Sequence, residues 1–145
     1  MRTVTIATWA MVLAAAGSAE ARTPHPRFVE PLAMTFSGTL ACADCSGLRT
    51  TLVLKRRGPG WAEGTYRLTQ TYVDKSHRRH TKGDWTTLRG DAADDDATVY
   101  ELDPDHADRA RHFLRIGRDA SLQALTSDLK PLPKGSPDRL RRVRR

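Results

Sequence analysis

Short runs in which apolar and polar residues alternate make up most of the middle of the chain. In the clearest run, Tyr66 and Leu68 alternate with Thr65, Arg67 and Thr69. A two-residue period is typical of a β-strand that buries one face. No window has the 3.6-residue period of an amphipathic helix, so the pattern predicts an all-β protein. The predicted strands cover residues 34–40, 49–56, 64–72, 83–87, 97–102, 112–116 and 122–126.

Turn-forming or strongly polar segments separate the predicted strands. The segment 57–60, Arg-Gly-Pro-Gly, predicts a hairpin because glycine and proline favour turn conformations. Four aspartates in segment 91–96 lack the ligand spacing of a calcium loop and predict a solvated hairpin tip. Segment 77–80 holds two histidines with two arginines between them. Because the arginine charges would repel a divalent metal ion, we predict a surface loop there.

The amino-terminal residues 1–21 have the organisation of a signal peptide. A basic start is followed by the apolar segment 6–16, which is shorter than the roughly 20 residues that span a bilayer. Small residues then predict cleavage near Ala21. Residues 22–31 contain three prolines and predict a flexible lead-in. No cysteine precedes Cys42, so we expect no lipobox and a soluble periplasmic protein.

Residues 32–126 are predicted to form one domain, followed by a basic tail rich in proline and arginine at 127–145. The chain has a net charge of +7, and five of its last seven residues are arginine. We expect such a tail to bind an anionic envelope surface; a solubilising tail without a partner is the alternative. Nucleic acid is not an expected partner of an exported protein. No second apolar run is long enough to cross a membrane, so no transmembrane segment is expected.

Both cysteines of the chain, Cys42 and Cys45, lie in the predicted turn between the first two strands. Three kinds of chemistry fit a pair with this spacing. A structural disulfide is feasible in an oxidising compartment, although so short a loop removes little chain entropy. Thiol-disulfide exchange would require a helix amino terminus near the first thiol, and the negative charge of Asp44 opposes thiolate formation. Two thiolates in a short turn also suit Cu(I), a soft ion.

The segment 36–48, Phe-Ser-Gly-Thr-Leu-Ala-Cys-Ala-Asp-Cys-Ser-Gly-Leu, resembles the signature of the NlpE amino-terminal domain. Further similar segments follow in the family's order: Leu-Val-Leu at 52–54, Gly-Thr-Tyr at 64–66, Gly-Asp-Trp at 83–85 and His-Phe-Leu-Arg-Ile at 112–116. The resemblance implies a small antiparallel β-barrel related to the lipocalins. Family members are envelope lipoproteins associated with copper resistance and with the Cpx envelope stress response.

The resemblance places Cys42 and Cys45 at the family's metal or redox position. It therefore predicts a periplasmic protein that binds copper or senses envelope redox state, with Cys42 and Cys45 as Cu(I) ligands or as a disulfide, and with an envelope stress-sensor protein as a partner. The alternative function is a carrier that holds a small apolar ligand inside the barrel. The chain lacks a nucleophile and base at motif spacing, a phosphate-binding glycine loop and a zinc-hydrolase pattern, so no enzymatic activity is expected.

Overall fold

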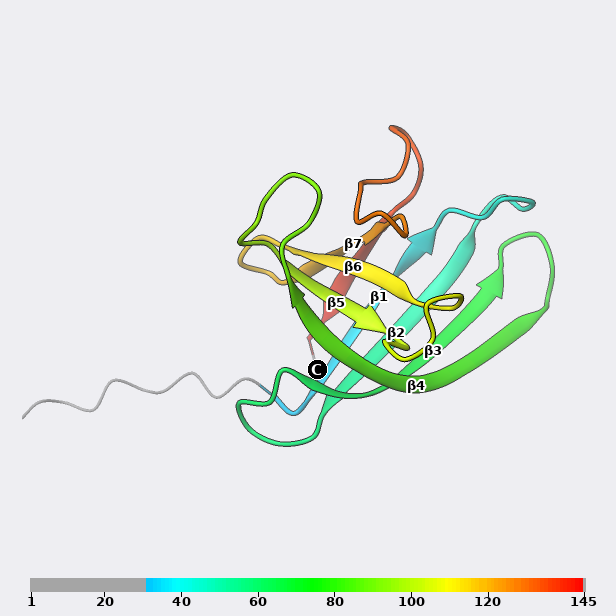
Figure 1. The fold of residues 1–145 in the computed structure, drawn as a ribbon. Coiled ribbons are helices and arrows are strands. Elements are labelled where there is room, and N and C mark those ends of the chain that lie inside the picture. The colour runs from blue at the N-terminus through cyan, green and yellow to red at the C-terminus, as the bar shows by residue number, and fades with distance from the viewer. Residues whose placement is uncertain (1–30, 145) are drawn as a thin grey trace, which may run out of the picture.

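Eight β-strands form the regular structure of residues 31–144, the part of the chain that the computed structural model describes. Each strand pairs antiparallel with the next, and β8 pairs with β1, so the sheet closes into a barrel (Figure 1). The prediction of an all-β antiparallel barrel is therefore confirmed. The strands are β1 (Ala33–Leu40), β2 (Leu48–Arg56), β3 (Glu63–Tyr72), β4 (Arg78–Arg89), β5 (Thr98–Leu102), β6 (Arg111–Ile116), β7 (Ser121–Leu125) and β8 (Arg139–Val143).

The inward side chains of the strands form one apolar cluster inside the barrel. In β3, Tyr66 and Leu68 are buried while Thr65 and Arg67 are exposed, as the alternation predicts. Trp85 of β4 lies edge-on against Tyr100 of β5, with ring centroids 5.4 Å apart. The buried cluster consists of Met34, Phe36, Leu40, Leu52, Leu54, Tyr66, Leu68, Trp85, Tyr100, Leu102, Phe113, Leu122 and Leu140.

Strand β4 begins earlier than the sequence indicates. Residues 78–80, predicted as part of a surface loop, pair with β3 through Thr71↔Arg78, Gln70↔Arg79 and Thr69↔His80. The loop prediction at 77–80 is therefore wrong for all but His77. The side chains of residues 78–80 are all exposed, so this part of β4 has no buried face and no alternation to reveal it.

The carboxy-terminal segment is part of the barrel. The sequence predicts a separate tail over 127–145, but β8 pairs with β7 through Leu122↔Leu140 and with β1 through Thr35↔Val143. The tail prediction is wrong for this segment, and the domain extends beyond residue 126. Leu140 is the one fully buried residue of β8, and arginines stand on both sides of it in the sequence. One apolar residue among arginines does not produce the alternation that predicts a strand.

Membrane association could involve the predicted amino-terminal segments or a membrane-spanning helix. The predicted signal peptide at 1–21 and all of the lead-in except Pro31 lie outside the described residues. Within residues 31–144, no helix has the length and apolar character needed to cross a bilayer.

The hydroxyl of Tyr66, whose ring is part of the barrel core, gives a testable pH dependence. It donates a hydrogen bond to Asp103 Oδ2 at 2.7 Å. Burial, then this hydrogen bond and the negative charge of Asp103, raise the pKa of Tyr66 above its ordinary value of 10.0. The unfolded chain then loses this proton at a lower pH than the folded chain does. The protonated Tyr66 hydroxyl therefore contributes fully to the free energy of unfolding below pH 10.0. This contribution is lost as pH rises toward the folded-state pKa of Tyr66.

We expect the free energy of unfolding to fall above pH 10 by up to about 1.4 kcal/mol per pH unit from Tyr66 alone. Tyr66→Phe should remove this part of the alkaline loss, at a cost of about 1 kcal/mol at neutral pH for the lost hydrogen bond. Urea unfolding between pH 8 and pH 11.5 measures both effects. Tyr72→Phe, at the half-buried end of β3, is the matched control and should keep the alkaline slope of the wild type. Equal slopes in wild type and Tyr66→Phe would contradict the assignment.

Candidate functional site: the cysteine turn

The turn between β1 and β2 carries both cysteines at one end of the barrel (Figure 1). The pair Leu40↔Leu48 closes the hairpin below it. Cys42 and Cys45 are partly buried, whereas Asp44 between them is exposed. The two sulfur atoms and the Asp44 carboxylate therefore lie at the protein surface rather than in the barrel interior.

Cys42 and Cys45 form a disulfide, with their Cα atoms 5.3 Å apart. This Cα separation lies within the ordinary range for a bridged pair. Asp44 Oδ1 lies 3.3 Å from Cys42 Sγ, and the carbonyl oxygen of Gly47 lies 3.4 Å from Cys45 Sγ. Each sulfur thus has an oxygen acceptor beside it, to which a thiol formed by reduction could donate a hydrogen bond.

Neighbouring segments hold the turn in place. Asp74, in the turn between β3 and β4, accepts hydrogen bonds from the Ser46 backbone N–H at 2.8 Å and from the Ser46 hydroxyl at 2.7 Å. These bonds, the one from the hydroxyl first, lower the pKa of Asp74. The Val73 N–H donates to the Gly47 carbonyl at 3.0 Å, and the Ala41 N–H donates to the Pro137 carbonyl at 2.6 Å. The role of Asp74 could not be predicted from the sequence, because no local spacing links it to a serine 28 residues away.

Three potential ligand atoms gather at the turn, one each from Cys42, Asp44 and Cys45, all within 4.8 Å of one another. Among residues 31–144, this is the one group of three or more histidine, cysteine or acidic side chains that is arranged in this way. In the bridged form the sulfurs are not thiolates and cannot serve as metal ligands. After reduction, two adjacent sulfur donors fit Cu(I). The structure brings the two predicted site residues together, and their role as copper ligands stays a prediction.

The barrel interior bears on the alternative function as a carrier. Trp85, Phe36 and Phe113 are the largest side chains buried there, each at most 2% exposed. Leucines from six strands pack around them in the same cluster. Large side chains thus occupy the space that a carrier would leave for its ligand, which argues against the carrier function.

Comparisons with known proteins identify the family. No curated protein matches the sequence. The structure is similar to the crystal structure of a candidate lipoprotein from Shewanella oneidensis, with a TM-score of 0.50 and 18% sequence identity, over 74% of this chain and 84% of that chain. At this identity the similarity shows the fold alone. The family of the NlpE N-terminal domain matches residues 36–134, which include the cysteine turn and more than half of the chain. This protein therefore belongs to the NlpE N-terminal domain family.

Proposed function

We propose that this protein is a periplasmic sensor or copper-binding protein of the cell envelope, in which the Cys42–Cys45 turn binds Cu(I) when reduced and is closed to metal when bridged. Membership of the NlpE N-terminal domain family supports a lipoprotein-like function in the envelope. The observation that carries the proposal is the pairing of two sulfurs with a carboxylate on an externally accessible turn. No enzymatic step is part of the proposal.

The redox state of the turn would control its metal binding. A dithiol reductant supplies two electrons and two protons, and the disulfide becomes two thiols while the reductant becomes a disulfide. Binding of Cu(I) by the two cysteines then releases the thiol protons. Oxidation and metal binding compete for the same two sulfur atoms, so one turn can respond to copper and to the redox poise of the envelope.

The surroundings of the turn suit it to signalling. Asp74 and the Pro137 carbonyl connect the turn to the β3–β4 turn and to the segment before β8. These contacts involve Ser46 and Ala41, which flank the cysteines, so they can persist when the disulfide opens. We infer that the partner, an envelope stress-sensor protein, reads the exposed face formed by residues 42–46.

Titration with Cu(I) against a colorimetric Cu(I) chelator tests this function. We expect the reduced protein to bind one Cu(I) per chain, and the bridged protein and the Cys42→Ser, Cys45→Ser double variant to bind none. Asp95→Asn, which removes an exposed carboxylate outside the turn, is the control for a general change of surface charge and should bind Cu(I) as the wild type does. Copper binding that is unchanged in the double variant, or equal in the reduced and bridged proteins, would contradict the proposal.

A further inference from the structure

The end of the barrel opposite the cysteine turn combines basic and apolar side chains. It is built from the start of β1, the β2–β3 turn, the β4–β5 turn with its four aspartates, the β6–β7 turn and the end of β8. Figure 1 shows the end of β8 on the same side of the barrel as the β2–β3 turn, away from the loop after β1. We call this surface the basic end, and define it by Leu32, Trp61, Arg118, Arg141, Arg142, Val143 and Arg144.

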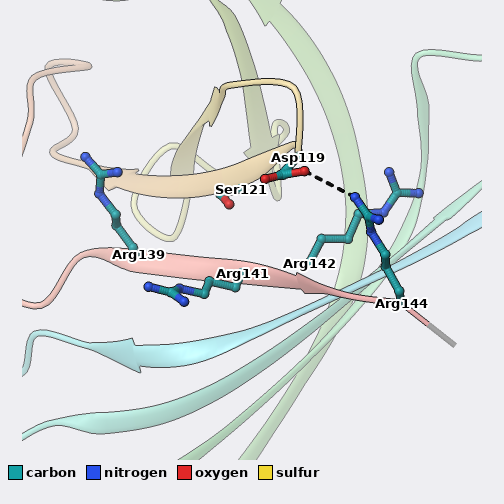
Figure 2. Close-up of a pocket in the computed structure, with 6 residues that line it drawn as sticks. All are labelled: Asp119, Ser121, Arg139, Arg141, Arg142 and Arg144. Carbon is teal, nitrogen blue, oxygen red and sulfur yellow. Dashed lines mark hydrogen bonds and ion pairs between the residues drawn. The ribbon is translucent and has the colours of Figure 1, made fainter.

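Four arginines line a pocket on β8 at the basic end (Figure 2). Its volume is about 420 Å³, and its other lining residues are Asp119 and Ser121. A neighbouring groove of about 760 Å³ shares Arg142 and Arg144 with it and adds Arg118. The two hollows therefore form one continuous basic surface.

Five arginines and one acidic residue, Asp119, line the two hollows, and the aspartates of the β4–β5 turn do not line them. Arg144 pairs with Asp119 at 3.1 Å, and Arg139 lies 3.9 Å from Asp138. Within the described part of the chain, Arg118, Arg141 and Arg142 form no ion pair. Guanidinium groups bind phosphate oxygens through paired hydrogen bonds, so a phosphate-bearing ligand matches this pocket.

Apolar side chains accompany these arginines. Four large hydrophobic residues of the described chain are exposed, and Leu32 at 47%, Trp61 at 52% and Val143 at 40% all belong to the basic end. The groove itself is lined by Ala33, Met34, Val53 and Val143 beside its arginines. Exposed tryptophan and aliphatic groups next to arginines are typical of surfaces that lie at a membrane–water interface.

We propose that the basic end docks on an anionic lipid bilayer, with arginines of β8 and the β6–β7 turn holding lipid phosphates. Trp61, Leu32 and Val143 enter the headgroup region, where their apolar groups leave water. The net charge of +7 adds a long-range attraction to the same surface. Docking in this orientation directs the cysteine turn away from the bilayer, where soluble copper, reductants or a partner can reach it.

Vesicle binding tests the proposal on the chain that starts at Arg22, after removal of the predicted signal peptide, because the apolar segment 6–16 would bind bilayers by itself. The probe is a vesicle of phosphatidylethanolamine with about one third phosphatidylglycerol, at 100 mM salt. The Arg118→Gln, Arg142→Gln variant should bind about thirtyfold more weakly than the wild type, since each basic residue near an anionic surface contributes substantially to binding. The matched control is Arg78→Gln, Arg79→Gln, which removes the same charge from the exposed start of β4 at the other end. We expect less than a threefold loss for the control.

Three results would overturn docking by this surface. Equal losses in the two double variants would show attraction by net charge alone. Equal binding of the wild type to zwitterionic phosphatidylcholine vesicles would show that the net negative charge of the bilayer has no part in recognition. Saturable binding of inorganic phosphate that also releases the protein from vesicles would assign the pocket to free phosphate. If Arg142→Gln lowers the unfolding midpoint, the double variant Arg118→Gln, Arg141→Gln is used instead, because both of its arginines are exposed. We expect the same thirtyfold loss of vesicle binding from this variant.

The fluorescence of Trp61 provides a second measurement. On anionic vesicles the wild type should show a blue shift and quenching by brominated lipid, and Trp61→Phe should lose both changes while keeping its fold. The chain also contains Trp9, which belongs to the removed segment 1–21, and Trp85, which is buried inside the barrel, so neither supplies this signal while the protein stays folded. Unchanged emission of Trp61 in the vesicle-bound wild type would contradict the proposed orientation.

Discussion

A chain shortened to end at Asp138 is expected to lose the cooperative unfolding transition of the barrel. Removal of β8 breaks the pairing of Leu122 with Leu140 and of Thr35 with Val143, and leaves β1 and β7 with open edges. It also removes the fully buried Leu140 from the core. Open strand edges and an uncovered core promote aggregation. Thermal unfolding followed by circular dichroism, together with size-exclusion chromatography, measures the loss.

Leu140→Ala removes the buried side chain of β8 and keeps its arginines, so it measures how much packing alone contributes to stability. Truncation of a fully buried leucine should lower the free energy of unfolding by about 2–5 kcal/mol. Leu32→Ala is the matched control, because Leu32 is 47% exposed and should cost less than about 1 kcal/mol. A shortened chain that unfolds as cooperatively as the wild type would show that residues 139–145 are dispensable, and equal costs for the two leucine variants would show that Leu140 is not part of the core.

The extent to which sequence predicts each strand depends on how many of its residues are buried on one face. In β3, burial alternates along most of the strand, and the two-residue period identifies it. The first five residues of β4 include no buried side chain, and β8 has only Leu140 buried. Backbone pairing with adjacent strands places these segments in the sheet, and the alternation of apolar and polar residues does not reveal that pairing.

The candidate site shows the same division between local and distant information. Cys42 and Cys45 lie three positions apart in sequence, so the motif and the resemblance to the family identified them together. Asp74 holds the turn from 28 residues away and could not be found from spacing. The arginines near the carboxy terminus were evident from composition, but only the closed barrel brings them beside Arg118 and the exposed apolar residues.

Gly38 links the family-like motif around the cysteines to the closure of the barrel. It lies in β1, next to Ser37, which pairs with Arg141 of β8. A Cβ atom at Gly38 would collide with the backbone carbonyl oxygen of Arg139 and lie 3.3 Å from Leu140 Cα. Because the obstacle is backbone rather than a flexible side chain, relief requires β8 to move away from β1. A glycine in a strand marks such a close backbone approach.

We therefore expect Gly38→Ala to lower the free energy of unfolding by about 3 kcal/mol, the upper part of the range for overpacked sites. Gly58→Ala is the matched control: its new methyl group would meet only the Trp61 side chain, at 3.2 Å, and this side chain can shift. The control should cost less than about 1 kcal/mol, and urea unfolding measures both variants. Hydrogen exchange provides the more specific readout, since amides of β8 should lose protection in Gly38→Ala while those of β3 retain it. Loss of stability with unchanged protection in β8 would mean that the glycine is needed elsewhere than at barrel closure.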